Sequence, residues 1–455
     1  MARSAYLTEF VSPATVRAIN YTPELGQFFR SEVSRLRDLA TIRSPGGAMF
    51  RAINCSPEFG EEFLTQADIF AAEPNGRTIR SDIMPDADSR RVKNGQILIA
   101  GVGTLGETEL YGRSIIADER LMGKLLTSDT LVLETKLDED THYYVYAFLC
   151  TRVGVRLVRS ASAGTKLLRP RRDLLGNLPI PIPDRPTLKK VADLIRTTIT
   201  ERGRYLREVR AARGCLEALP EMQEAIAMCQ ERKARCTLWD EDLPTMTGWT
   251  YASLGRALPL LRRKWKTRLG DCLEPGGMMH GGRYTRTRCS PPFGVDFLSQ
   301  RDIFMIRPVP QRILAIGGTD LFAREGMILV AGDGQLSEGS LFGKATIVTA
   351  NIAGAAVTEH AVRITFLDDY RKLAFAFLST DIGLRLLRST AFGTSIPKLS
   401  TSLARNLPFP EVTDEVKSSV DTCVIAAMEA SVTAANAEKE AVRIIEEEVL
   451  PQWLA

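Results

Sequence analysis

INCSPEFGEEFLTQADIF, at residues 53–70, has a second version in the same chain, TRCSPPFGVDFLSQRDIF at residues 287–304. Cys, Ser-Pro, Phe-Gly, Phe-Leu, Gln and Asp-Ile-Phe recur between them at one constant offset. Repetition at a long period decides how many modules a chain contains, so it comes before any assignment of secondary structure. The matched pair predicts an internal duplication.

Further blocks repeat in the same order. NGQILIAGVGTLGETELYGR (94–113) matches EGMILVAGDGQLSEGSLFGK (325–344), and YAFLCTRVGVRLVRSASAGT (146–165) matches FAFLSTDIGLRLLRSTAFGT (375–394). Both copies close with Asn-Leu-Pro-x-Pro, at 177–181 and 406–410. Chance similarity does not keep so many blocks in register, so the chain is predicted to consist of two related modules.

A charged stretch with few glycines follows each closure. Apolar residues recur at helical spacing in 186–217 and in 411–449, which predicts a long amphipathic helix after each module. Residues 185–236 carry a net charge of +5 and residues 411–449 a net charge of −7. Opposite charges beside apolar stripes favour pairing of the two helices as an antiparallel coiled coil. The alternative is that each helix packs on its own module.

Inside each module the apolar runs QILIAG and MILVAG break at glycine, as half-buried strands do. The segments HYYVYAFLCTRVGVRLV and RKLAFAFLSTDIGLRLL are typical of helices. The predicted fold class is therefore α+β, with two tandem related domains that are each followed by a long helix. The expected boundaries are 1–185 for the first domain, 186–237 for the central helical region, 238–410 for the second domain and 411–455 for the C-terminal helix.

The composition is that of a globular protein. Of 455 residues, 44% are hydrophobic and 25% charged, which excludes wholesale disorder and a collagen-like chain. No apolar run is long enough for a membrane span and the first residues lack the order of a secretory signal, so the expected location is cytoplasmic. Eight cysteines without a CxxC pair and three histidines at no ligand spacing predict neither a disulfide framework nor a metal site. No catalytic constellation is recognisable, so the chain is predicted not to be an enzyme.

Two short motifs invite a stronger interpretation. Gly101-Val102-Gly103-Thr104-Leu105-Gly106 follows an apolar strand, but a polar, turn-rich segment stands where a dinucleotide fingerprint needs a helix. A tight strand-to-strand turn is favoured. Ser290-Pro291-Pro292-Phe293 is similar to the loop with which amino-methyltransferases hold a flipped base, but Ser56-Pro57-Glu58-Phe59 breaks that motif in the other copy. Both are interpreted as structural turns.

Basic clusters are the candidate binding sites. Between Arg152 and Arg172 there are seven cations and no acid. Lys and Arg neutralise phosphates, and Arg can also bind a guanine edge bidentately. A charge run is usually only a solvated face. Its recurrence in both modules favours DNA binding by Arg91, Lys93, Arg113, Thr165, Lys166, Arg169, Arg171 and Arg172 in the first, and by Arg283, Arg286, Arg288, Lys344, Thr394 and Lys398 in the second. The two threonines either contact the backbone or cap the next helix.

This arrangement resembles the specificity (S) subunit of type I restriction-modification enzymes, which has two target-recognition domains separated by helical conserved regions. The resemblance rests on Leu36-Arg37-Asp38 and Arg268-Leu269-Gly270-Asp271, on the strand-turn blocks ending in Gly101 and Gly332, on the two Gly-Thr turns, and on the Leu-Pro closures. It spans most of the chain.

The resemblance implies a non-catalytic subunit of a restriction-modification or related phage-defence complex. Each domain would recognise one half of an asymmetric, bipartite DNA target, and the paired helices would set the spacing between the halves. Methyltransferase subunits carrying S-adenosylmethionine would bind the helices and flip an adenine in each half, and a restriction or translocase subunit could join them. This chain would hold no cofactor and no metal. Two alternatives remain open: a stand-alone DNA amino-methyltransferase that uses Ser290 to Phe293, and a scaffold that does not bind DNA.

Overall fold

The chain forms two compact units in a computed structural model that describes residues 33–46, 52–106, 108–164, 167–230, 256–290, 292–316, 321–337 and 339–454. The first unit comprises Met1–Gly203 together with Thr433–Ala455, and the second comprises Arg204–Val432. Two long helices, α8 (Arg185–Glu217) and α15 (Asp414–Ile444), each contribute residues to both units. The predicted domain boundaries remain a proposal, since the compact units are divided within the long helices.

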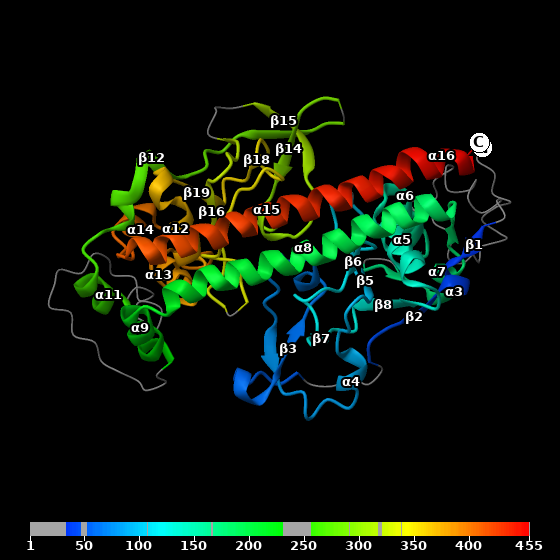
Figure 1. Cartoon of the computed structure of the whole chain (residues 1–455), viewed down its shortest axis with the longest axis horizontal. Helices are drawn as coiled ribbons and strands as arrows, with labels where there is room; N and C mark the ends of the chain where they lie inside the picture. Colours follow the sequence, from blue (N-terminus) through cyan, green and yellow to red (C-terminus); the bar gives the residue numbers. More distant parts are fainter. Residues whose placement is uncertain are drawn as a thin grey trace. The chain divides into compact units, whose positions relative to one another are not determined.

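The first unit is built from short strands and helices (Figure 1). In chain order they are β1 (Ser34–Arg35), α3 (Leu36–Leu39), β2 (Ala40–Arg43), η3 (Pro57–Phe59), β3 (Glu61–Leu64), η4 (Asp68–Phe70), β4 (Arg77–Ile79), α4 (Ala87–Arg90), β5 (Ile97–Ala100), β6 (Ser114–Ile116), β7 (Leu125–Leu126), β8 (Thr130–Thr135), α5 (Glu139–Cys150), α6 (Arg152–Ser160), β9 (Ser162–Ala163), β10 (Arg169–Pro170), α7 (Arg172–Gly176) and β11 (Pro179–Ile180). The main sheet has the order β2-β8-β5-β6, and a second sheet has the order β4-β3-β7 with β3 and β7 parallel. Strand pairs β9–β10 and β1–β11 complete the unit.

Most of this order of elements recurs in the second unit. They are α9 (Pro220–Gln230), α11 (Leu258–Lys264), η6 (Leu269–Cys272), β12 (Leu273–His280), β13 (Thr285–Arg288), β14 (Val295–Leu298), η7 (Asp302–Phe304), β15 (Gln311–Ile316), β16 (Ile328–Ala331), β17 (Ala345–Ile347), β18 (Ala356–Val357), β19 (Ala361–Phe366), α12 (Asp368–Leu378), α13 (Asp381–Ser389), β20 (Ala391–Phe392), β21 (Lys398–Leu399) and α14 (Thr401–Arg405). The sheet β12-β19-β16-β17 corresponds to the main sheet of the first unit, and β13-β15-β14-β18 corresponds to its second sheet, with β14 and β18 again parallel.

The same side-chain contacts recur in both copies. Arg159 in α6 donates to the carbonyls of Tyr111 and Glu109, and Arg388 in α13 donates to those of Phe342 and Ser340. Each arginine therefore fixes the segment between two strands onto a helix. Together with the matching sheets, these contacts confirm the predicted α+β fold of two related modules.

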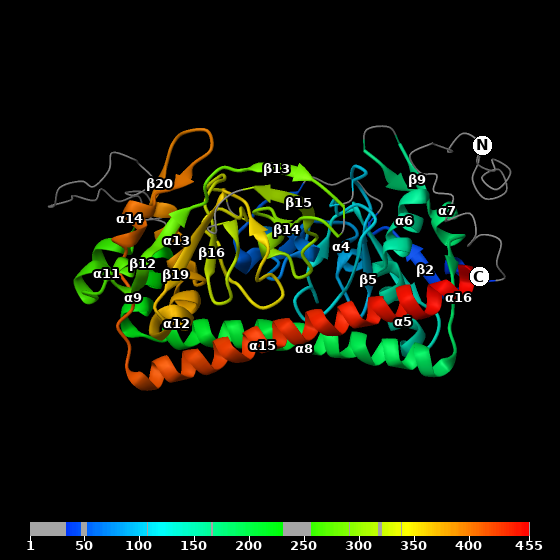
Figure 2. The same ribbon diagram turned by 90° about the horizontal axis from the view of Figure 1, so that it is seen from above.

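The long helices α8 and α15 pack against each other in an antiparallel direction, as predicted (Figure 2). In the first unit the Thr198 hydroxyl lies 3.4 Å from the carbonyl oxygen of Ala434, while Lys190 faces Glu440. In the second unit Arg204 lies 3.9 Å from Glu429. The chain ends in a π-helical turn (Ile445–Val449) and α16 (Leu450–Leu454), whose apolar residues belong to the core of the first unit.

A buried polar cluster joins α8, α15 and α5 within the first unit. Arg202 is 2% exposed and donates to Glu438 at 2.8 Å, and the Tyr146 hydroxyl donates to the other oxygen of that carboxylate. Although burial alone would lower the pKa of Arg202, the Glu438 carboxylate raises it above its ordinary value. Asp118 and Arg120, which form an ion pair with no exposed surface, complete the cluster.

The second unit replaces this cluster with apolar and neutral residues. At the offset that relates Asn177 to Asn406, Arg202 corresponds to Ser431 and Glu438 to Val209. The carbonyl of Ser431 accepts a hydrogen bond from Asn351 at 3.0 Å, and Val209 is buried. The two units therefore hold the helix pair by different chemistry at equivalent positions.

Breaking the buried pair should be costly, whereas replacing both partners should not. We expect Glu438→Gln to lower the free energy of unfolding of the first unit by about 3–5 kcal/mol, because Arg202 then stays buried without a counter-charge. The double variant Arg202→Met with Glu438→Leu, made together with Tyr146→Phe so that the hydroxyl does not lose its acceptor, should regain most of that loss, because hydrophobic residues of similar volume substitute well for a buried pair. Urea unfolding of the full chain measures both changes. Equal losses in the single and double variants would contradict the assigned cause.

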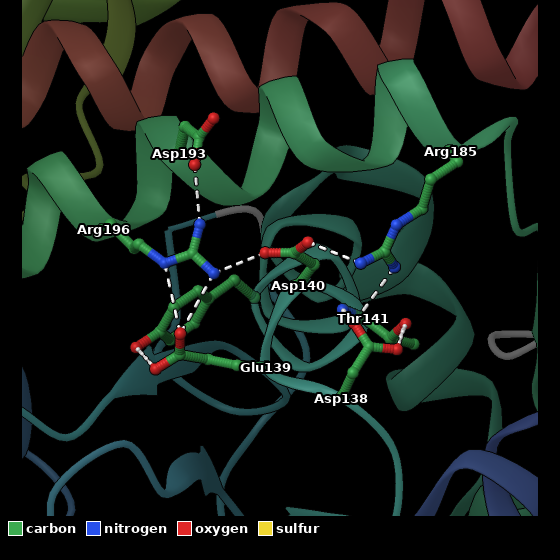
Figure 3. Close-up of polar contacts among 8 residues, drawn as sticks. Asp138, Glu139, Asp140, Thr141, Arg185, Asp193 and Arg196 are labelled. Carbon is green, nitrogen blue, oxygen red and sulfur yellow. Dashed lines mark hydrogen bonds and ion pairs between the residues drawn. The ribbon is translucent and has the colours of Figure 1, made fainter.

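The start of α8 binds the acidic start of α5 (Figure 3). Arg185 contacts Asp138 at 3.1 Å and Asp140 at 2.8 Å, and Arg196 contacts Glu139 at 3.0 Å and also Asp140. Carboxylates in the first turn of a helix are favoured by the positive end of its dipole. These ion pairs attach the first turns of α8 to the module that precedes it.

Asp138 caps α5, and its stabilising effect should depend on pH. Its carboxylate accepts from the hydroxyl and the backbone amide of Thr141, and these bonds together with Arg185 lower its pKa from 3.8 to about 2. Because the folded-state pKa is depressed, the contribution is present above about pH 4 and is lost as the pH falls towards 2.

We expect Asp138→Ala to lower the free energy of unfolding by about 1 kcal/mol at neutral pH. Asp138→Asn keeps the cap and should cost only about 0.5 kcal/mol, since the lost charge is half exposed and screened. The difference between wild type and Asp138→Asn should shrink between about pH 4 and pH 2 in guanidinium unfolding. A difference that stays constant with pH would assign the effect to something other than the charge.

Candidate nucleic-acid interface

In the second unit, β13 and the hairpin β20–β21 lie on the side away from α8 and α15 (Figure 2). All four residues of β13 are exposed, and β13 pairs only with β15, so it is an edge strand. Side chains of Arg286 and Arg288 point to the same face of this strand, because they are two residues apart. An exposed edge that carries cations instead of apolar residues resists pairing with other strands and is available to an anion.

Arg286 is held in place and Arg288 is not. Arg286 contacts the Glu359 carboxylate at 2.6 Å and lies over the rings of Phe297 and Tyr284, with its guanidinium carbon 4.9 and 5.6 Å from their centroids. Arg288 and the neighbouring Arg283 are exposed, and neither has an acidic partner among the described residues. Free cations of this kind suit phosphates, whereas a fixed guanidinium suits a directional contact.

The hairpin β20–β21 carries the predicted Thr394 and Lys398, both exposed. The Lys398 ammonium lies 3.6 Å from the Asp333 carboxylate, which also contacts the His360 imidazole at 2.6 Å. Ser400 caps α14 by accepting from the Leu403 amide, so Thr394 does not cap the next helix. Of the predicted residues in this unit, Lys344 alone is only half exposed, at the start of the segment that leads into β17.

The glycine motifs anchor the hairpins. Residues 101–113 connect the antiparallel strands β5 and β6, so the motif at Gly101 is a strand-to-strand connection, but it is a longer loop than the predicted tight turn. Gly103 and Leu168 exchange backbone hydrogen bonds of 3.2 and 2.8 Å. In the second unit, the Gly334 amide donates to Pro397 and the Leu399 amide to Gly332. These hydrogen bonds join each hairpin to the glycine-containing segment beside it, the glycine platform (residues 101–106 and 332–337).

The first unit places an arginine where the second has Lys398. At the offset between Gly164 and Gly393, Arg169 in β10 corresponds to Lys398 in β21. Arg169 is exposed and contacts the Asp129 carboxylate at 3.4 Å. The Arg169–Asp129 pair is exposed and contributes little to stability, so Arg169 can exchange its carboxylate for a phosphate at low cost. Lys398 pairs instead with a largely buried carboxylate, Asp333.

Two more of the predicted arginines, Arg171 and Arg172, come shortly after Arg169 in the sequence. Arg171 pairs with Asp173, whose hydrogen bond raises the pKa of the guanidinium, and Arg172 is exposed in the first turn of α7. Arg113 donates to the Glu109 carbonyl at 3.0 Å. The structure therefore gathers Arg169, Arg171 and Arg172 on one strand-helix segment.

Arg91 and Lys93 lie elsewhere in the first unit. Arg91 adjoins the second sheet through a bridge to Leu125 and pairs with both oxygens of Glu61, at 2.7 and 2.8 Å, and with Asp88. The Glu61 carboxylate raises its pKa, and the same contact lowers the pKa of Glu61. Lys93 is exposed. These two residues do not belong to the strand-helix segment of Arg169. Thr165 and Lys166 lie outside the described residues.

Exposed apolar side chains at equivalent positions were not anticipated. Leu167 and Ile396 stand at the tips of the hairpins β9–β10 and β20–β21, 59% and 63% exposed. Phe59 and Phe293 are likewise exposed in both copies. The sequence repeat could have predicted these residues, because the members of each pair occupy matched positions in the two copies.

The Phe293 turn is fixed by its backbone. Its carbonyl accepts from the Arg312 guanidinium at 2.9 Å and from the Cys289 thiol. An aromatic ring that holds a flipped base belongs in a pocket, whereas the ring of Phe293 is largely exposed.

Within the described residues, no helix has the length and apolar character needed to cross a membrane. The same part of the chain contains no group of three or more His, Cys, Asp or Glu side chains that could hold a metal ion.

Comparisons with known proteins yield similarity only at the level of structure. No protein-family model matches the sequence, and no curated protein matches it. The type I restriction-modification system S subunit from M. genitalium aligns with 93% of this chain and 97% of its own, at 13% identity and a TM-score of 0.33. The HsdS subunit from Thermoanaerobacter tengcongensis aligns with 92% of this chain and 95% of its own, at 14% identity and a TM-score of 0.26.

A third structure comes from work on complex assembly and conformational transition of the type I restriction-modification system. It aligns with 92% of this chain and 96% of its own, at 14% identity and a TM-score of 0.26.

Proposed function

We propose that this chain is a DNA sequence-specificity subunit that directs partner enzymes to an asymmetric, bipartite target. The observation that carries the proposal is the repeated hairpin. Each unit presents a β-hairpin with an exposed cation at one equivalent position, Arg169 or Lys398, fixed to a glycine platform. A non-catalytic reader of DNA needs such cations on a rigid element, because phosphate contacts fix the register in which bases are read.

Different surroundings of the two hairpins support an asymmetric target. The second unit adds the edge strand β13 with Arg286 and Arg288, whereas Ala52 and Asn54 stand at the equivalent positions of the first. Two DNA-binding domains with the same fold and different side chains at the DNA surface recognise different base sequences. The partners in this proposal are DNA methyltransferase subunits that carry S-adenosylmethionine, with a restriction or translocase subunit as a further candidate, in the cytoplasm.

Arg288→Ala should weaken binding to all duplexes alike. Loss of one phosphate contact should flatten the dependence of log K on log salt concentration by about 0.9. Arg210→Ala is a matched control, because Arg210 is an equally exposed arginine on α8. Fluorescence anisotropy of labelled duplexes at several salt concentrations measures the slope. If Arg288→Ala changes sequence preference and leaves the slope intact, Arg288 reads a base; if the unaltered chain binds no duplex, the chain acts as a scaffold.

Deletion of the gene should remove methylation at one split, asymmetric motif in the native host. Single-molecule sequencing that detects modified bases, with the gene intact, deleted and restored, measures this and reveals the target. Restoration with a variant that lacks Arg288 and Arg172 should return methylation only partly, because each half of the target loses one phosphate contact. A methylome unchanged by deletion would contradict a role in directing methylation. Binding of S-adenosylmethionine by the isolated chain would favour a stand-alone methyltransferase.

A further inference from the structure

The tips of the two hairpins share a feature that the proposed DNA-binding role does not explain. A large aliphatic side chain, Leu167 or Ile396, is mostly exposed to water at the same position of each tip. Single exposed apolar residues are common on protein surfaces. A pair at equivalent positions of a duplicated hairpin, next to the cation proposed to bind DNA, requires a more specific account.

A glycine with a positive φ angle follows the first strand of each hairpin. Gly164 and Gly393 adopt φ angles of +115° and +94°, a region that residues with a Cβ atom rarely enter. A Cβ atom at Gly164 would lie 2.5 Å from the Leu167 carbonyl oxygen. Hydrogen bonds to Gly103 and Gly334 tie the returning strands to the glycine platforms. In each hairpin, the residue that follows the aliphatic side chain is therefore hydrogen-bonded to the glycine platform.

The surroundings of the tips suit a polyanion. Arg169 and Lys398 follow two residues after Leu167 and Ile396, and the segment continues to the exposed Arg172 in the first unit. A protein partner usually covers a broad apolar patch, whereas the large apolar side chains exposed on the described part of these hairpins are Leu167 in the first unit and Phe392 and Ile396 in the second. A two-stranded β-ribbon fits the major groove of B-DNA, which is about 12 Å wide, but not the minor groove of about 6 Å.

We propose that Leu167 and Ile396 contact the 5-methyl groups of thymines in the major groove, one in each half of the target. This inference rests on the proposed DNA-binding function. Of the four bases, only thymine presents a methyl group in the major groove, so an aliphatic tip discriminates in its favour without a hydrogen bond. The cations behind the tip hold the flanking phosphates, and the tip supplies a sequence preference.

Replacement of thymine by uracil tests this contact, because it removes the methyl group and changes neither the phosphates nor the base pairing. A random-sequence duplex library is first enriched by binding to the unaltered full-length chain. The enriched pool is then copied with either thymine or uracil nucleotides, and both versions are titrated with the wild type, Leu167→Ala, Ile396→Ala, the double variant, and Ile425→Ala. Ile425 is an exposed aliphatic residue on α15 and serves as the matched control.

Each methyl contact should contribute about fourfold in affinity. We expect replacement of thymine by uracil to lower the DNA affinity of the wild type and of Ile425→Ala by about sixteenfold. The affinity of each single hairpin variant should fall by about fourfold, and that of the double variant should not change. A wild type that is indifferent to uracil would overturn the inference, as would a double variant with the full uracil penalty. Weaker binding of the hairpin variants without any effect of uracil would point instead to insertion between base pairs. Absence of salt-dependent duplex binding by the wild type would refute the proposed function itself.

Discussion

The first unit depends on the buried ion pair between Arg202 and Glu438, because neither charge can be buried without the other. Removing two charges from water costs several kcal/mol, and the cost is offset only when both partners are in place with good geometry. Arg202 lies on α8 and Glu438 on α15, and the Tyr146 hydroxyl from α5 donates to the same carboxylate. The first unit therefore needs the C-terminal part of α15, which lies in the segment Thr433–Ala455 of that unit.

The second unit shows that the same helix pair can be held without buried charge. Val209 and Ser431 stand where the first unit has Glu438 and Arg202. A pair of helices with uniformly apolar stripes can slide by one turn with little penalty, whereas a single buried polar contact fixes the register. A slip of α15 along α8 would separate Arg202 from Glu438 and leave both charges buried without a partner. One charged contact in one unit is sufficient for that purpose, and the other unit gains stability from apolar packing.

The repeat and the helical periodicity were sufficient to predict the two modules, the α+β class and the antiparallel pair of long helices. These features depend on patterns that extend over tens of residues, so a wrong assignment at a few positions does not change the prediction. The site was harder to predict, because ion pairs depend on residues that are distant in sequence. Arg91 appeared as available as Arg172 in the sequence, yet Glu61 and Asp88 bind it. The exposed tips at Leu167 and Ile396 were missed because apolar residues are expected to be buried, and only comparison of the two copies could have revealed them.

The acids beside the hairpin cations show which part of the arrangement the two units share. Arg169 contacts Asp129, which corresponds to His360 in the other copy, whereas Lys398 contacts Asp333, which corresponds to Val102. The cation therefore occupies equivalent positions in the two units. Its carboxylate partner comes from a different position in each unit. The Arg169–Asp129 pair is exposed and contributes too little stability to require a cation at this position, whereas Asp333 beside Lys398 is largely buried and also bonds His360. The shared element is thus the cation, with each acid orienting it locally. A cation at the same position in both units with different internal partners supports the proposed contact with a DNA phosphate.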